Sequence, residues 1–416
     1  METEFDAIVI GAGPAGSSAA ILLADAGWRV ALVEKQAYPR RKVCGECIAA
    51  ANLPILEALG IGTAIPQLAG PPLRQVALVC GARIVRAPMP AYGDPNHQWG
   101  LALGREHLDT LLLEQARSRG AVLFQPWQVC SIAGAAGNFH CRLRQADQGE
   151  ERLITASLVI DAHGSWEPPA QQDGRLQAPR GSRHRPSDLF AFKANFLNAA
   201  LEPGLLPVFS FAGGYGGMVI GGGASATFAF CLRRDALTQA RSQFPGIKPA
   251  EAANSWVKKH SSAAATLFGD GAQLGKWLGA GPIRPGIHLR GRYEGVFQIG
   301  NAAGEAHPII GEGISMALQS AVLLVDTLLA HGVRRADGQA QLRVHAAYAE
   351  GWRRHFARRI RLSALYAHLA MRPDIFSGLL PALERNPVLL TWLARWCGKV
   401  CPGPGLASNR MAHEYA

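Results

Sequence analysis

The 416-residue sequence lacks an unbroken apolar run of the length that a transmembrane helix needs. It also lacks the charged and apolar leader of a secretory signal, because the first predicted strand starts at Asp6, so we expect a cytoplasmic protein. The eight cysteines are scattered and do not form the dense pattern of a secreted disulfide framework. This cysteine usage indicates a reducing compartment.

Acidic residues are few compared with basic ones: there are 31 aspartates and glutamates and 42 lysines and arginines, which gives a net charge of +11. Part of the excess gathers late in the chain, at Arg353, Arg354, Arg358, Arg359 and Arg361. No nucleic-acid recognition motif accompanies these arginines, so we expect no nucleic-acid partner. They fit a solvated helix face, a peripheral contact with an anionic membrane, or an acidic partner such as an acyl carrier protein.

A glycine-rich loop begins ten residues into the chain. The loop, Gly11-Ala12-Gly13-Pro14-Ala15-Gly16, follows an apolar segment at 6–10 that predicts a buried strand of a parallel sheet. Residues 17–26 then predict a helix, and residues 29–33 predict a second strand that ends at Glu34. A G-x-G-x-x-G loop between a strand and a helix is typical of dinucleotide binding.

Each glycine of this loop has a physical role. Gly11 permits the tight turn, Gly13 lets the backbone approach a pyrophosphate, and Gly16 lets the helix pack closely on the strand. The phosphates would meet free N–H groups at the positive end of the helix. Glu34 lies about twenty residues further on, where a carboxylate accepts a hydrogen bond from a ribose 2′-OH and repels a 2′-phosphate, which excludes NADP as the tightly bound ligand.

A second glycine-rich loop lies near the other end of the chain. It reads Gly300-Asn301-Ala302-Ala303-Gly304 and is followed by Pro308 and by Gly311-Glu312-Gly313-Ile314. A helix that opens at Gly311 would point its free N–H groups at the pyrimidine edge of a flavin and so stabilise the reduced state. Two such loops predict flavin adenine dinucleotide, because FAD needs a site for each of its halves.

The segment between the loops predicts a different kind of structure. Residues 189–232 alternate apolar and small residues with Gly-rich turns, which predicts an antiparallel sheet, and residues 168–186 form a polar crossing segment. We therefore expect an α/β fold: a Rossmann-type, glutathione-reductase-like FAD-binding domain, an inserted antiparallel-sheet substrate domain, and a helical C-terminal region. The predicted boundaries are 1–75, 101–180 and 281–335 for the FAD-binding domain, 76–100 and 181–280 for the substrate domain, and 336–416 for the C-terminal region.

The C-terminal region predicts two helices that could reach a partner. Residues 342–369 predict one long or kinked helix. Trp352 and Phe356 lie on one face of this helix, and most of the arginines lie around that face. Residues 387–400 predict a short apolar helix. We expect these helices to cover the substrate entrance and to dock on an anionic surface; the alternative is that the aromatics pack onto the FAD-binding domain.

The motif Arg41-Lys42-Val43-Cys44-Gly45-Glu46, together with the second loop, resembles the geranylgeranyl reductase branch of FAD-dependent oxidoreductases. That branch shares the wider fold of the aromatic hydroxylases typified by p-hydroxybenzoate hydroxylase. The resemblance covers roughly residues 5–365. It implies an FAD-binding set of Gly11, Gly13, Ala15, Gly16, Glu34, Lys35, Arg41, Lys42, Val43, Cys44, Gly45, Arg105, Val129, Gly164, Gly300, Asn301, Gly304, Pro308, Gly311, Gly313 and Ile314.

The sequence departs from the pattern of this branch at two places. Asn301 stands where the family usually has an aspartate toward the ribityl chain. The stretch Gly214-Tyr215-Gly216-Gly217-Met218-Val219 replaces the aromatic Tyr-x-Trp-x-Phe-Pro motif of geranylgeranyl reductases. The Trp-x-Trp-x-Ile-Pro motif of tryptophan halogenases is also absent. Tyr215 and His307 are the candidate catalytic residues, as a donor that orients the substrate and as a general acid or base.

Two cysteine patterns leave alternatives open. Cys44 and Cys47 have the spacing of a redox dithiol, but Cys44 also belongs to the flavin motif and Cys47 fits a buried small side chain. A zinc site that adds Cys397 and Cys401 lacks further metal-type spacing, so we predict no metal.

The predicted function is an FAD-dependent monooxygenase that hydroxylates a phenolic, polyketide-type or lipid-like small molecule. NAD(P)H would be a transient reductant, because no second Rossmann loop is present for it. One alternative is a flavin-dependent reductase or dehydrogenase of a C=C bond in an isoprenoid, lipid or carrier-bound chain. Another is a flavin-containing binding subunit without turnover.

Overall fold

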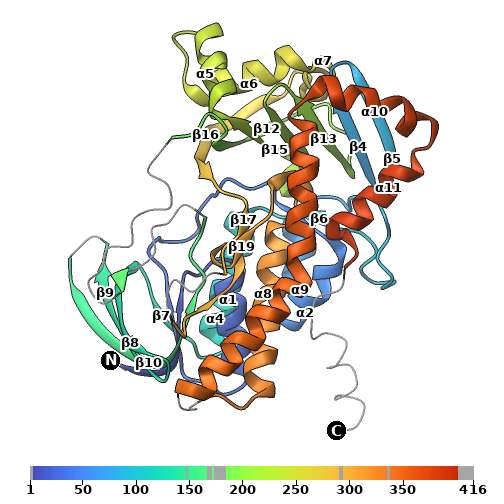
Figure 1. Ribbon diagram of the computed structural model, residues 1–416. Helices are drawn as coiled ribbons and strands as arrows, with labels where there is room; N and C mark the ends of the chain where they lie inside the picture. The colour runs from blue at the N-terminus through green and yellow to red at the C-terminus, as the bar shows by residue number, and fades with distance from the viewer. Residues whose placement is uncertain are drawn as a thin grey trace.

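The computed structural model describes residues 3–146, 149–165, 171–172, 184–289, 294–334 and 338–401. Two β-sheets form the centres of two packed units, and the long helix α9 (Gly338–Ala370) runs beside both of them (Figure 1). Most of the crossing segment predicted at 168–186 lies outside the described residues.

The first sheet carries the dinucleotide loop. Its strand order is β11-β8-β9-β10-β1-β2-β7, and β18 also pairs with β10. Strands β10, β1, β2, β7 and β18 run parallel, so their carboxyl ends meet at one edge. The strands are β1 (Glu4–Ile10), β2 (Val30–Val33), β7 (Val122–Phe124), β8 (Trp127–Ala135), β9 (Asn138–Gln145), β10 (Glu151–Asp161), β11 (Gln171–Gln172) and β18 (Phe297–Gln298).

Apolar helices cover this sheet because the parallel strands are apolar on both faces. Residues Ala7 to Val9 of β1 are completely buried. Their core continues into the covering helices α1 (Pro14–Asp25), α4 (Arg105–Ser118) and α8 (Gly313–Ala330). The sequence did not predict the antiparallel pair β8 and β9, although Phe139, Cys141 and Leu143 alternate with exposed or half-buried residues along β9.

The second sheet lies in the unit that the sequence predicts to hold the substrate, called the substrate unit below, and its strand order is β16-β12-β15-β14-β13-β4-β5. All neighbours are antiparallel except β13 and β4, which are parallel. Helices α5 (Arg234–Gln243), α6 (Pro249–His260) and α7 (Ser262–Phe268) close one face over a phenylalanine-rich core. The strands are β4 (Gln75–Cys80), β5 (Arg83–Pro88), β12 (Leu189–Leu197), β13 (Leu205–Phe211), β14 (Gly214–Ile220), β15 (Ala226–Arg233) and β16 (Ala272–Ile283).

Smaller elements connect the two units. The short strands are β3 (Cys47–Ile48), which pairs with β6 (Leu101–Ala102), and β17 (Gly286–Ile287), which pairs with β19 (Gly304–Glu305). The short helices are α2 (Leu53–Ala58) and α3 (Ile65–Leu68). Residues Pro308–Ile310 form a single 3₁₀ turn before α8.

The C-terminal helices lie over both units. Helices α10 (Pro373–Arg385) and α11 (Val388–Ala394) lie beside β4 and β5 (Figure 1), and α11 continues as a π-helical turn over Arg395–Lys399. Trp352 and Phe356 of α9 are buried in the core of the FAD-binding unit, and the Trp352 ring lies against Gly304. The expectation that these two aromatics form a docking face is therefore wrong, because the glycine at 304 makes room for Trp352 inside the fold.

The sequence predicts no segment of transmembrane length, but helix α8 is long and apolar enough to meet that criterion. Its 18 residues have a mean hydropathy of 1.6, and α8 is the one helix in the described ranges that is long and apolar enough by length and composition. However, 67% of it is buried inside the fold, against α1 and α9. Burial of this kind is typical of a core helix.

Candidate active site

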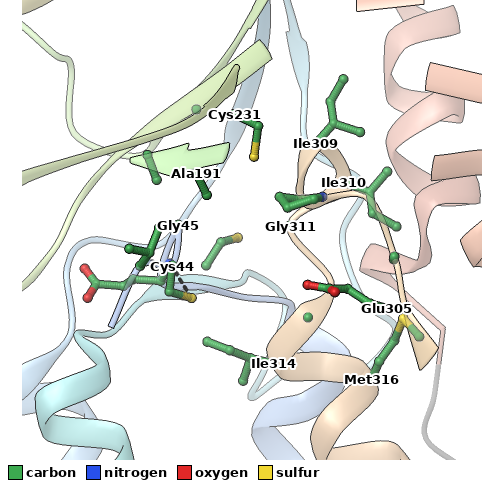
Figure 2. Close-up of a pocket in the computed structure, with 18 of the residues that line it drawn as sticks. Cys44, Gly45, Ala191, Cys231, Glu305, Ile309, Ile310, Gly311, Ile314 and Met316 are labelled. Atoms are coloured by element: carbon green, nitrogen blue, oxygen red, sulfur yellow. Dashed lines mark hydrogen bonds between the residues drawn. The ribbon is translucent and has the colours of Figure 1, made fainter. Parts of the chain in front are cut away.

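A cavity of about 470 Å³ lies between the two units and receives side chains from both. One end contains the two glycine-rich loops, and the other end is lined by the substrate sheet and the C-terminal helices. Figure 2 shows the middle of the cavity, where the Cys44 loop, the Gly311 turn and the start of α8 approach strands of the substrate sheet.

The first glycine loop leaves open space at one position only. A Cβ atom at Gly16 would lie 1.8 Å from the Gly11 carbonyl oxygen, and one at Gly11 would lie 2.8 Å from the Ala162 carbonyl oxygen. A Cβ atom at Gly13 would meet nothing closer than two guanidinium nitrogens at 3.9 Å. Gly11 and Gly16 therefore shape the turn, whereas Gly13 leaves room at the N-terminus of α1 for a phosphate group.

The two guanidinium groups near Gly13 belong to Arg40 and Arg105. Arg105 makes a two-pronged ion pair with Asp109, with both N···O distances at 2.7 Å. Arg40 lies 3.2 Å from Glu34 and 3.6 Å from Asp109. The buried carboxylates thus hold two cations beside the phosphate space, where guanidinium groups bind phosphate oxygens.

Arg40 was missed in the sequence interpretation, which assigned Arg41 to the flavin. Arg41 is exposed, does not line the cavity, and donates a hydrogen bond to Asn195 of the substrate sheet. The two arginines are adjacent, so nothing in the local sequence could distinguish them.

Glu34 lies at the end of β2 and lines the cavity. Its carboxylate accepts hydrogen bonds from the backbone N–H groups of Ala12 at 3.0 Å and of Gln36 at 2.9 Å. It therefore also fixes the glycine loop, in addition to the ribose contact that the sequence predicts.

The Cys44 loop is fastened to the substrate sheet by Glu46. One carboxylate oxygen of Glu46 pairs with Lys193, which is completely buried, and accepts a hydrogen bond from the backbone N–H of Arg105 at 3.1 Å. The other accepts a hydrogen bond from the Thr227 hydroxyl at 2.7 Å. This cluster fixes the loop that carries Lys42 to Gly45 along the cavity wall.

The second glycine loop places a buried carboxyl group in the cavity. Glu305 accepts a hydrogen bond from the Ser165 hydroxyl at 2.9 Å, and that hydroxyl in turn accepts one from the Asn301 amide at 2.6 Å. Within the described residues, Oε2 of Glu305 has no hydrogen-bond partner. Figure 2 shows the carboxylate directed into the cavity near Ile314. Burial raises the pKa of Glu305 to about 7.

Glu305 was not among the predicted site residues. Its only signal in the sequence is a charged residue inside an otherwise apolar loop, and that signal does not distinguish a buried carboxyl group from an exposed one. Glu312 follows the 3₁₀ turn Pro308–Ile310 by two residues and instead pairs with the buried Lys399 at 3.1 Å.

The two predicted catalytic residues meet. The Tyr215 hydroxyl lies 3.1 Å from Nδ1 of His307, and Tyr215 lines the cavity. His307 lies behind the tyrosine, on a second and more polar pocket that Arg284, His368 and Arg372 also line. Burial, and then the nearby His368, lowers the pKa of His307 to about 4, so its imidazole is neutral at pH 7.

The end of the cavity away from the glycine-rich loops is almost wholly apolar. Gly217 of β14 contributes no side chain, and a Cβ atom there would meet only the Pro207 carbonyl oxygen, at 3.5 Å. The absence of the tryptophan motif therefore leaves space over this strand. The apolar lining consists of Val76, Leu78, Met89, Leu206, Val208, Val219, Phe376, Leu379, Leu383, Leu390, Leu393 and Ala394.

Most of the predicted FAD-binding residues line this cavity. They are Gly11, Gly13, Ala15, Glu34, Lys42, Val43, Cys44, Gly45, Arg105, Gly164, Gly300, Asn301, Pro308, Gly311, Gly313 and Ile314. The predicted residues that do not line it are Gly16, Lys35, Arg41, Val129 and Gly304. Val129 of β8 is buried in a core with residues of β9 and β10, so it does not reach the cavity.

The cysteines make no bond with one another in the described ranges. Cys47 is buried, and burial raises the pKa of its thiol, the opposite of what a reactive thiolate needs. Among the residues that the structure describes, no group of three or more histidine, cysteine or acidic side chains could hold a metal ion.

Comparisons with known proteins agree with this geometry. Residues 4–362 match the FAD binding domain family. A menaquinone reductase of Mycolicibacterium smegmatis is 25% identical over 99% of this chain and 98% of its own. A flavin-dependent brominase structure has a TM-score of 0.74 at 18% identity, covering 99% and 98% of the two chains. A geranylgeranyl bacteriochlorophyll reductase-like protein of Thermoplasma acidophilum has a TM-score of 0.74 at 17% identity, covering 99% and 100%.

The residues present fit FAD. The open space at Gly13, the two guanidinium groups and the N-terminus of α1 suit a pyrophosphate, and the second loop with the N-terminus of α8 suits the flavin half. The predicted fold class is confirmed: a parallel-sheet FAD-binding unit, an antiparallel-sheet unit and helices at the C-terminus.

Proposed function

This chain belongs to the FAD-binding domain family, and from that premise we propose that it is an FAD-dependent monooxygenase of a lipophilic phenol. By this we mean an aromatic, polyketide-type ring that carries an apolar chain. The coarser activity, that of an FAD-dependent oxidoreductase acting on a small molecule, does not depend on this choice of substrate.

The observation that carries the proposal is the two-ended chemistry of the cavity. Its flavin end contains the Glu305 carboxyl group and the Tyr215 hydroxyl, and its far end contains aliphatic side chains from β4, β13, α10 and α11. A phenol hydroxyl would find hydrogen-bond partners at the first end, and an alkyl or prenyl chain would replace water at the second. Burial of a long apolar chain contributes about 0.8 kcal/mol for each CH₂ group.

Each polar group has a defined task in this proposal. Bound flavin, once reduced and exposed to O₂, supplies the oxygen atom that is transferred. Glu305 would accept the phenol proton at Oε2, since a carboxyl group with a pKa of about 7 can act as a base at neutral pH. Tyr215, fixed by His307, would orient the ring, and the apolar walls would exclude water.

The first test needs only the purified holoprotein and its products. NADH and NADPH are added separately, and loss of the oxidised flavin spectrum identifies the reductant. Long-chain alkylphenols, or phenols without a chain, are then added to the reduced enzyme together with O₂. The masses of the products are measured by mass spectrometry. We expect long-chain phenols to gain one oxygen. A flavin that neither reductant bleaches would leave the protein as a binding subunit without turnover.

One specific observation favours a second candidate, reduction of a C=C bond in an isoprenoid or lipid chain. One relative that is similar over nearly the whole chain is a menaquinone reductase. The same apolar cavity would hold a polyprenyl chain, and protonated Glu305 would donate the proton that accompanies a hydride. A polyprenyl quinone in the same assay distinguishes the two activities, because reduction adds two hydrogens and no oxygen.

A further inference from the structure

We propose that helices α10 and α11 dock this protein on an anionic lipid membrane, so that a lipophilic substrate can enter the cavity from the bilayer. The docking face consists of Ile375, Val388, Leu389, Trp392 and Trp396. The route of the substrate rests on the proposed function, whereas the docking itself does not.

The docking face is exposed to an unusual degree. Each of its five side chains is between 43% and 57% exposed, although all are large and apolar. Val388, Trp392 and Trp396 follow one another at a spacing of four residues, so they lie on one side of the helix, while Leu390 and Ala394 on the other side are buried. Val388, Leu389, Trp392 and Trp396 fall within nine residues of the chain, and soluble proteins rarely expose so many large apolar side chains in one short segment without a partner.

The buried sides of the same two helices form a wall of the cavity. Phe376 and Leu383 of α10 line it, as do Leu390 and Leu393 of α11, whereas none of the five residues of the docking face does. Leu379 lines the cavity and is also 45% exposed. Helices α10 and α11 therefore lie between the apolar end of the cavity and the docking face.

The charges beside the docking face have the sign that an anionic membrane needs. Arg372, Arg385 and Arg395 are exposed on or next to α10 and α11. Of the two acidic residues in this stretch, Glu384 is paired with Arg83 at 2.5 Å, which leaves Asp374. Tryptophan at the level of the headgroups and arginine toward anionic phosphates is the arrangement of a helix that lies in the membrane interface.

The arginines of α9 are a weaker basis for docking. Trp352 and Phe356 are buried, Arg359 is buried and bonded to Gln319, and Arg354 pairs with Glu350 on its own helix. An acyl carrier protein would be attracted mainly by charge, whereas the most exposed feature here is apolar. A lipid surface therefore fits the docking face better than a carrier protein does.

The test is co-sedimentation of the FAD-loaded protein with vesicles. One set of vesicles contains phosphatidylcholine alone and the other equal parts of phosphatidylcholine and phosphatidylglycerol, each at low and high salt. We expect binding to the anionic vesicles that weakens at high salt, because the charges are screened. The double variant Trp392→Ser, Trp396→Ser should bind the anionic vesicles at least about tenfold more weakly than the wild type, because two large apolar contacts are lost.

Two further variants separate the contributions. Arg385→Gln with Arg395→Gln should reduce binding to the anionic vesicles about tenfold or more and remove most of the salt dependence, since each arginine near such a surface contributes about 1 kcal/mol. Leu153→Ser is the matched control, because Leu153 is 57% exposed but lies on β10 of the other unit. This control should bind like the wild type.

The outcomes are distinct. Equal retention of the tryptophan variant and the wild type on anionic vesicles would overturn the docking, as would capture on an immobilised acyl carrier protein with no vesicle binding. The tryptophan variant should keep its flavin content and its bleaching by reductant in detergent, which shows that it is folded. Vesicle binding without turnover of any phenol or quinone would support the docking and overturn the proposed function.

Discussion

The hydroxyl of Tyr215 lies 3.1 Å from Nδ1 of His307, and this contact joins the substrate sheet to the flavin loop. Tyr215 is 1% exposed, and the imidazole is neutral at pH 7 because burial, and then His368, lowers the pKa of His307 to about 4. The Nδ1 atom of a neutral imidazole can accept a hydrogen bond from the tyrosine hydroxyl, so the pair needs no counter-charge inside the fold.

Tyr215→Phe should destabilise the protein by about 1–3 kcal/mol, because it leaves a half-buried ring nitrogen without its partner. Urea unfolding measures this change. In the double variant Tyr215→Phe, His307→Leu both partners are apolar, so part of the loss should be recovered. Strictly additive losses would show that the two side chains do not interact.

Gly13→Ala should abolish FAD binding and leave the protein folded, because its Cβ atom enters the phosphate space and meets no protein atom closer than 3.9 Å. Gly16→Ala is the contrasting variant, since its Cβ atom would lie 1.8 Å from a backbone oxygen and should disrupt the fold itself. Flavin absorbance and circular dichroism of both proteins give the comparison. A yellow, stoichiometrically loaded Gly13→Ala protein would contradict the assignment.

Glu46→Gln should cost about 3–5 kcal/mol of stability, because it leaves the buried Lys193 ammonium without its counter-charge. The exposed pair of Arg86 and Glu202 provides the control: Glu202→Gln should produce no measurable change in the same unfolding experiment. If both variants unfold like the wild type, the Glu46 cluster does not fasten the Cys44 loop.

Glu305→Gln should make the flavin-free protein more stable at alkaline pH relative to the wild type. Folded Glu305 keeps its proton up to about pH 7, whereas the unfolded carboxyl group releases it near 4.5, so the wild type loses stability as pH rises between these values. The gap between variant and wild type should grow by up to roughly 3 kcal/mol across that window and stay constant above it. Glu114→Gln, at an exposed side chain, is the control variant. A pH-independent gap would mean that Glu305 ionises as an exposed carboxyl group does.

Gly217→Leu should weaken substrate binding and leave flavin content unchanged. Its side chain would project into the apolar end of the cavity, where the nearest atom to its Cβ is 3.5 Å away. At the neighbouring Gly216 a Cβ atom would lie 2.6 Å from that of Phe230, so Gly216→Leu should damage the fold instead. The KM for an accepted long-chain phenol or quinone should rise about tenfold or more in Gly217→Leu, since several CH₂ groups of the substrate lose their space. An unchanged KM would place the substrate elsewhere.

The sequence by itself determined the cofactor loops and the fold class. A phosphate is bound by backbone N–H groups of consecutive residues, so the spacing of Gly11, Gly13 and Gly16 is enough to predict their roles. The same holds for the loop from Gly300 and the helix start at Gly313, and periodicity was enough to predict the antiparallel sheet. The fold class was therefore readable from local patterns.

Only the tertiary structure decided which side chains share the cavity. The roles of Arg40 and Arg41 differ because one is held by Glu34 and the other by Asn195, more than 150 residues away. Glu305 is a buried carboxyl group that lines the cavity between the two units. Trp352 and Phe356 are enclosed by the FAD-binding unit, whereas the side chains of the docking face stay exposed on α10, on α11 and on the turn after α11. Burial and long-range pairing depend on how the two sheets pack, and no spacing along the chain encodes that packing.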